Sequence, residues 1–72
     1  MKIDNQIFGE NLKGYRKERK YSQAEVAKRI GVSQQCVSQW EQGQIEPTLT
    51  MLWKLADLFE ISVDELIGRK EY

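Results

Sequence analysis

The chain has 72 residues, of which 40% are hydrophobic and 31% charged, and 11 basic side chains balance 11 acidic ones. This length suits one domain and leaves no room for a second. One cysteine and no histidine exclude an internal disulfide, a zinc cluster and a Ser/His or Cys/His catalytic pair. No run of 18 apolar residues and no signal-peptide pattern is present. We therefore expect a cytoplasmic protein that is not an enzyme, holds no metal or cofactor and contacts no membrane.

The first predicted helix runs from about residue 6 to residue 19. Phe8, Leu12 and Tyr15 recur at intervals of four and three residues, which places them together on its inner face. Gly9 and Gly14 each weaken a helix by about 1 kcal/mol relative to alanine. The packing of this helix must therefore compensate for two glycines.

Two short helices follow, and each has its own start and stop signal. Ser22 and Glu25 have the spacing of a capping box, and the helix that they open ends at Gly31. Only one residue separates Gly31 from Ser33, which caps a second short helix that ends at Gly43. Because so tight a turn prevents the two helices from lying antiparallel, we expect them to cross steeply, as in a helix-turn-helix.

One face of the second short helix is polar but carries no charge. It consists of Gln34, Gln35, Ser38, Gln39 and Gln42, which span an arc of roughly 140° at about 100° per residue. A solvated helix face ordinarily carries Glu and Lys. Glutamine offers a paired donor and acceptor that match the N6/N7 edge of adenine in the DNA major groove. This face therefore indicates base reading, with an ordinary polar surface as the alternative.

Charge is unevenly distributed along the chain. Residues 1–29 hold eight basic and four acidic side chains, a balance of +4, and the remainder holds three basic and seven acidic ones, a balance of −4. This polarity favours an N-terminal half that faces phosphate. The net charge of zero argues against DNA, because most DNA-binding domains are basic.

The fourth predicted helix, capped by Thr48, is apolar around most of its circumference. Its two apolar stripes are Leu49, Leu52, Trp53, Ala56 and Phe59, and Met51, Leu55 and Leu58. We interpret it as the central strut of a bundle, with a strut that also supplies a dimer contact as the alternative. Trp53, and Trp40 in the second short helix, lie within apolar stripes and are interpreted as core aromatics, with ligand-stacking groups as the alternative. A second capping box, Ser62 with Glu65, opens a short fifth helix that stops at Gly68.

The ordered set formed by residues 21–27, 30–34 and 37–43, with its flanks at 12–16 and 47–66, resembles the Cro/C1-type helix-turn-helix family, also called lambda-repressor-like or XRE. The resemblance implies an all-α, compact five-helix bundle that binds operator DNA as a dimer. We take residues 1–72 as a single domain, with the Cro/C1-type domain at about 12–67 and the helix-turn-helix at 22–42.

Family resemblance and helix position together define the candidate site. The residues expected to read bases are Gln34, Gln35, Ser38 and Gln39, near the N-terminal end of the second short helix. Gln23, the first residue of its helix, matches a glutamine that lies against a backbone phosphate in the family. The weaker phosphate candidates are Ser33, Lys13, Lys17, Lys28 and Gln42. Because the base-reading residues include no arginine, we expect at least one important A·T pair in each half-site.

Two further positions have a structural interpretation. Arg16 and Glu41 match a partly buried ion pair that holds the first and third helices together in similar repressors, with two unrelated surface charges as the alternative. Cys36 lies at the margin of the core face and is interpreted as a small hydrophobe. A redox sensor is its alternative, although no basic neighbour at helical spacing would lower its pKa.

The sequence therefore predicts a sequence-specific DNA-binding transcriptional regulator, a repressor associated with the nucleoid. Its expected partners are double-stranded operator DNA of palindromic sequence and a second copy of itself, with no small-molecule ligand. The alternative is a protein-interaction module, antitoxin-like or an adaptor, that keeps the fold but binds DNA weakly or not at all. The zero net charge and Glu46, in a loop that is often basic in the family, favour this alternative. The absence of aromatic and aliphatic anchors on the polar face disfavours it.

Overall fold

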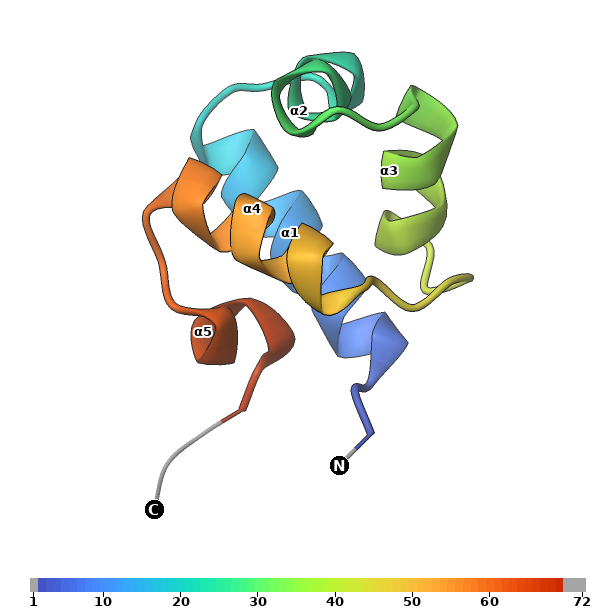
Figure 1. Ribbon diagram of the computed structural model, residues 1–72, viewed down its shortest axis with the longest axis vertical. Helices are drawn as coiled ribbons and strands as arrows, with labels where there is room; N and C mark the ends of the chain where they lie inside the picture. The colour runs from blue at the N-terminus through green and yellow to red at the C-terminus, as the bar shows by residue number, and fades with distance from the viewer. Residues whose placement is uncertain (1, 70–72) are drawn as a thin grey trace.

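Five α-helices make up the part of the chain that the computed structural model describes, residues 2–69 (Figure 1). They are α1 (Asn5–Glu18), α2 (Gln23–Ile30), α3 (Gln34–Glu41), α4 (Leu49–Phe59) and α5 (Val63–Ile67). No strand occurs in residues 2–69, and no helix in that range is long and apolar enough to cross a membrane. The predicted all-α, five-helix architecture is confirmed.

A polar side chain caps the N-terminus of every one of these helices. The caps are Asp4, Ser22, Ser33, Thr48 and Ser62, each of which accepts a hydrogen bond from a backbone N–H of the first turn. Both predicted capping boxes are present. Gly31 ends α2 at a φ of 80°, in the left-handed region where glycine is favoured. The tight connection between α2 and α3 therefore follows directly from local sequence.

The core lies where α1, α3, α4 and α5 meet beneath α2. Its largest fully buried side chains are Phe8, Leu12, Val26, Val37, Leu55 and Leu66. α1 packs against α3 and α5, and α2 packs against α3 and α4. Figure 1 shows α3 at one edge of this assembly and α5 at its lower end. The bundle thus holds α3 against two other helices and leaves its outer side open.

Side chains of α1 and of its C-cap close the C-terminal ends of two other helices. Arg19 donates from Nη2 to the carbonyl oxygen of Phe59 at 2.8 Å, and Asn11 donates from Nδ2 to that of Leu66 at 3.2 Å. The last carbonyl groups of a helix have no partner within it, and a cation is favoured at its negative end. These bonds fasten α4 and α5 to α1.

The structure corrects the prediction for α4 at two positions. Leu52 and Phe59 are buried, but Leu49 is 72% exposed and Trp53 is 63% exposed. Of the two tryptophans assigned to the core, only Trp40 lies there. Helical periodicity places residues on a common face, but a bundle of this size covers α4 from one side. The outer face of α4 therefore exposes Leu49 and Trp53 beside the polar residues Thr50, Lys54 and Asp57.

The two glycines of α1 have different surroundings. A Cβ atom added at Gly9 would overlap the carbonyl oxygen of Trp40 and lie 2.8 Å from that of Glu41, whereas a Cβ at Gly14 would meet no described atom within 4 Å. Gly9 therefore permits the close approach of α1 to the end of α3. Gly14 lowers helix propensity without any such packing role.

Substituting each glycine by alanine separates these two effects. Gly14→Ala is expected to stabilise the fold by about 1 kcal/mol through helix propensity alone. Gly9→Ala should destabilise it by roughly 1–3 kcal/mol, because α1 and α3 must move apart to make room. Urea unfolding followed by circular dichroism measures both changes. If both variants were stabilised equally, the close approach at Gly9 would be disproved.

Candidate nucleic-acid interface

The polar face of α3 lies on the surface of the bundle. Gln34 and Gln35, in the first turn, are exposed, and Ser38 and Gln39, one turn further, are half-buried. The opposite side of α3 is anchored in the core by Val37 and Trp40, which are 0% and 2% exposed. Trp40 also packs edge-on against Phe8 of α1, with ring centroids 6.3 Å apart. The core therefore fixes the rotation of α3 and holds its uncharged face outward.

A short chain of hydrogen bonds joins the end of α3 to this face. Gln44 donates from Nε2 to Oε1 of Gln42 at 2.8 Å, and Gln42 donates from Nε2 to Oγ of Ser38 at 3.0 Å. Because Ser38 accepts from Gln42, its own hydroxyl proton stays free to donate. The bond between Ser38 and Gln42 could have been expected, because helical side chains four residues apart meet. The sequence contains no signal for the bond from Gln44.

A buried ion pair connects α1 to α3. Arg16 donates from Nε to Oε2 of Glu41 at 2.6 Å and from Nη2 to Oε1 at 3.1 Å, with only 11% and 4% of the two side chains exposed. The hydrogen bonds to Glu41 raise the pKa of Arg16 above its ordinary value, although burial acts in the opposite direction. Arg16 also donates from Nη1 to the carbonyl oxygen of Tyr21 at 2.9 Å. The predicted Arg16–Glu41 pair is confirmed.

Gln23 joins the same ion pair from the first turn of α2. It is half-buried and donates from Nε2 to Oε1 of Glu41 at 3.0 Å. One of its amide protons is therefore engaged, and its second proton and its carbonyl oxygen remain available. Nearby, the backbone N–H of Ser22 donates to Glu25 in the capping box, and this bond lowers the pKa of Glu25. The link from Gln23 to Glu41 was not predicted from the sequence.

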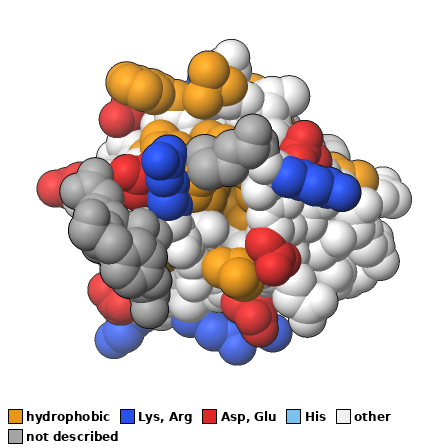
Figure 2. Space-filling model, turned by 90° about the horizontal axis from the view of Figure 1, so that it is seen from below, with side chains coloured by type: hydrophobic (Ala, Val, Ile, Leu, Met, Phe, Trp, Pro, Cys, Tyr) orange, Lys and Arg blue, Asp and Glu red, His pale blue; other side chains and the backbone are white. Residues whose placement is uncertain are grey.

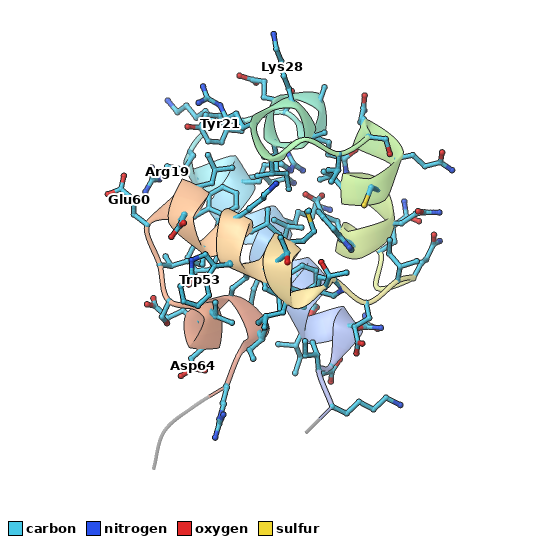
Figure 3. All side chains as sticks on the ribbon, viewed as in Figure 1. Arg19, Tyr21, Lys28, Trp53, Glu60 and Asp64 are labelled. Atoms are coloured by element: carbon cyan, nitrogen blue, oxygen red, sulfur yellow. The ribbon has the colours of Figure 1, made fainter. Side chains whose placement is uncertain are left out.

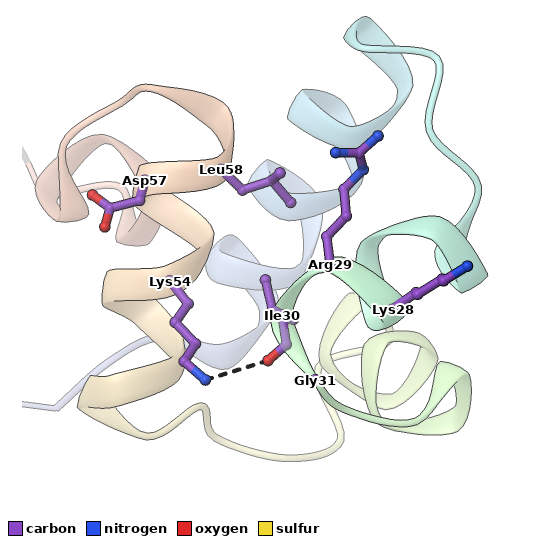
Figure 4. Close-up of a pocket in the computed structure, with 7 residues that line it drawn as sticks. All are labelled: Lys28, Arg29, Ile30, Gly31, Lys54, Asp57 and Leu58. Carbon is purple, nitrogen blue, oxygen red and sulfur yellow. Dashed lines mark hydrogen bonds between the residues drawn. The ribbon is translucent and has the colours of Figure 1, made fainter.

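The basic candidates are more scattered than the uncharged ones. Lys13 and Lys17 are exposed on α1, four residues apart and so on one side of that helix. Lys28 lies toward the other end of α2 from Gln23 and lines a surface hollow of about 580 Å³ with Arg29, Gly31 and residues of α4 (Figure 4). Figure 3 shows the side chain of Lys28 pointing away from the bundle. The structure thus does not bring Lys28 together with Gln23.

Ser33 and Cys36 lie at the N-terminal end of α3. Ser33 caps α3 by accepting from the backbone N–H of Cys36 at 3.1 Å, so its hydroxyl proton is free to donate. Cys36 is half-buried against the core, and burial raises the pKa of its thiol. A raised pKa keeps the thiol protonated and poorly reactive at neutral pH, which agrees with the interpretation of Cys36 as a small hydrophobe.

Comparison with known proteins identifies the family. A helix-turn-helix family model matches residues 12–66, and the chain belongs to this family, in its Cro/C1-type branch. The chain is 43% identical over 60 residues to the cryptic phage CTXphi transcriptional repressor RstR of Vibrio cholerae, which covers 83% of this chain and 54% of that protein. The chain spans about half the length of most of the curated relatives that it matches.

Solved structures with the same fold include a regulator and an enzyme. The P22 c2 repressor, from a Salmonella phage and bound to a synthetic operator, superimposes with a TM-score of 0.84 at 35% identity, over 90% of this chain and 98% of that one. The hydroxypropylphosphonic acid epoxidase of S. wedmorenis matches with a TM-score of 0.83 at 32% identity, over 93% of this chain but only 36% of that enzyme. The fold is therefore shared with one part of a repressor, of whose full length the match covers 30%, and with one part of an enzyme.

Removing the charge of Glu41 tests the importance of the ion pair. Glu41→Gln leaves the Arg16 guanidinium buried without its counter-charge, which is expected to cost roughly 3 kcal/mol of unfolding free energy. The matched control is Glu60→Gln, because Glu60 forms an exposed pair with Arg19 at 3.7 Å and should contribute less than about 1 kcal/mol. Urea unfolding followed by tryptophan fluorescence compares the two. Equal losses in both variants would show that the buried pair has no special role.

Proposed function

We propose that this protein is a sequence-specific DNA-binding transcriptional regulator, a repressor, that inserts α3 into the major groove. The observation that carries this proposal is the row of uncharged amide and hydroxyl side chains held outward on α3. Aromatic and aliphatic anchors, which a protein-binding surface ordinarily presents, are missing from that row. The relationship to RstR and the superposition on the operator-bound P22 c2 repressor support the same assignment.

Base reading follows from the chemistry of the first two turns of α3. Gln34 and Gln35 are exposed at the end of the helix that enters the groove first. Each can donate to N7 and accept from N6 of an adenine, and each such pair discriminates against other bases by about 1–3 kcal/mol. Ser38 supplies a donor, because its oxygen already accepts from Gln42. We infer an operator half-site that contains at least one A·T pair.

Phosphate contacts fix the position of α3 in the groove. The first-turn amides of α2 and α3 carry the positive ends of their helix dipoles, and Gln23 and Ser33 stand beside them with free protons. Lys13 and Lys17 add charge from α1, with smaller roles for Lys28 and Gln42. Because the loop after α3 contains Glu46 in place of a basic residue, ionic contacts are few and affinity depends only weakly on salt.

Two copies act on a palindromic operator whose half-sites lie about one helical turn apart.

We assign the protein no catalytic activity. The epoxidase shares this fold over only about a third of its own length, so the likeness leaves most of that enzyme unmatched. A cytoplasmic, nucleoid-associated location follows from binding to DNA. The alternative function, a protein-interaction module, is favoured by the net charge of zero and by the exposure of Leu49 and Trp53 on α4.

The double variant Gln34→Ala/Gln35→Ala separates these two functions. Duplexes selected from a random pool by the wild-type protein should contain a shared half-site, and gel shifts on that duplex should show the double variant bound about 30-fold or more weakly. The control is Gln6→Ala, an exposed glutamine of α1, which should bind as the wild type does. If selection yields no shared sequence, or if the double variant binds normally, the base-reading role is refuted.

A further inference from the structure

A chain of three polar side chains runs from the loop after α3 back to the outer face of that helix. Gln44 donates to Gln42 at 2.8 Å, and Gln42 donates to Oγ of Ser38 at 3.0 Å. Figure 2, a view from below, shows that uncharged polar side chains and backbone, in white, predominate at the right, which is the side of α3 in Figure 1. The base-reading role proposed above uses Ser38 but gives Gln44 no part.

We propose that Gln44 is a positioning residue for base recognition. Through Gln42 it makes the hydroxyl group of Ser38 a hydrogen-bond donor toward DNA, and it thereby decides which base edges Ser38 can bind. The inference rests on the proposed function, because Ser38 meets base edges only when α3 lies in the major groove. A residue outside the reading helix then controls base preference at one position of the half-site.

The backbone of the loop holds Gln44 beside Gln42. Gly43 has a φ of 73°, in the left-handed region that favours glycine, and this conformation turns the chain back toward α3. The backbone N–H of Gln44 then donates to the carbonyl oxygen of Gln39 at 2.9 Å, and that of Gln42 donates to the carbonyl oxygen of Ser38 at 3.0 Å. Both glutamine side chains are exposed, but they start from backbone positions that these bonds fix. Their contact is therefore built into the end of the helix.

The amide group of Gln42 gives the chain a direction. A carboxamide accepts through its oxygen and donates through its nitrogen. Because the oxygen of Gln42 accepts from Gln44, the nitrogen is the end that faces Ser38. Oγ of Ser38 thus receives a hydrogen bond, and a hydroxyl group that accepts one bond becomes a stronger donor in the next. The hydroxyl proton of Ser38 is left for a partner outside the protein.

A donor at Ser38 distinguishes bases by the acceptors on their major-groove edges. Guanine presents O6 and N7 and thymine presents O4, whereas cytosine presents only its N4 amino group, which is itself a donor. A serine hydroxyl without the two glutamines could bind either kind of group, because it both donates and accepts. We therefore expect guanine or thymine in preference to cytosine at the position that Ser38 faces. Adenine carries an acceptor and a donor and is tolerated.

Two substitutions of Gln44 act on the direction of the chain in opposite ways. A carboxylate only accepts, so Gln44→Glu turns the nitrogen of Gln42 toward position 44 and its oxygen toward Ser38. Ser38 then donates to Gln42 and offers DNA an acceptor, so that cytosine or adenine becomes preferred. An ammonium group only donates, so Gln44→Lys keeps the wild-type direction. The added charges change overall affinity, but they act alike on every base sequence.

Selection of half-sites from a random duplex pool tests this role. Ser38→Ala identifies the position that Ser38 reads, because the preference there should fall about fivefold, the discrimination that one neutral hydrogen bond supplies. At that position Gln44→Lys should keep the wild-type preference for guanine or thymine over cytosine, and Gln44→Glu should reverse it. Gln44→Met removes the donor without adding charge and should reduce the preference without reversing it. Circular dichroism verifies that each variant is folded.

The possible results distinguish the role of Gln44 from the function of the protein. A wild type that selects no shared half-site contradicts the proposed function. When the wild type does select one, the role of Gln44 is overturned if Gln44→Glu and Gln44→Lys show the same base preferences. It is also overturned if Gln44→Met matches the wild type, or if Ser38→Ala alters the preference at no position. A reversal confined to the position that Ser38 reads supports it, because a general disturbance of α3 would weaken preferences at every position.

Discussion

The carboxylate of Glu41 is the point at which three helices are joined. It accepts two hydrogen bonds from Arg16 of α1 and one from Gln23 of α2, and it belongs to the last turn of α3. With 4% of its side chain exposed, this carboxylate cannot be solvated by water and depends on these donors. Any rotation or sliding of α3 would break at least one of them. Glu41 thus sets the direction in which the outer face of α3 points, and it lies at the opposite end of the helix from Gln34 and Gln35, which we propose contact bases.

The main effect of this arrangement is to fix the position of α3 relative to α1, more than to stabilise the fold. A buried ion pair is often no more stabilising than well-packed hydrophobic residues, because desolvation offsets much of the attraction. What the pair provides here is a unique register between α1 and α3, and Gly9 allows the two backbones to come close enough for it. Gln23 then links that register to the first turn of α2, next to the positive end of the helix dipole. The helix that we propose to read the groove is in this way held as one unit with α1 and with the first turn of α2.

Local signals account for what could be predicted from the sequence. Capping residues and glycines mark the ends of α2 and α3, because each acts through backbone groups within a few positions. The Arg16–Glu41 pair was accessible only through resemblance to the family, since no local rule joins residues 25 positions apart. The exposure of Trp53 could be predicted neither from local rules nor from the family resemblance. Periodicity tells which side chains share a face of α4, but whether another element covers that face depends on the whole bundle.

The central claim is that the uncharged row on α3 enters the major groove of DNA. It is tested most directly by nuclear magnetic resonance of the side-chain amide groups during titration with a duplex selected by the protein. The side-chain amide resonances of Gln34, Gln35 and Gln39 are expected to shift or to become protected from exchange, while that of Gln6 stays unchanged. Perturbations confined to α4 and α5, with the glutamine resonances of α3 unaffected, would contradict this account.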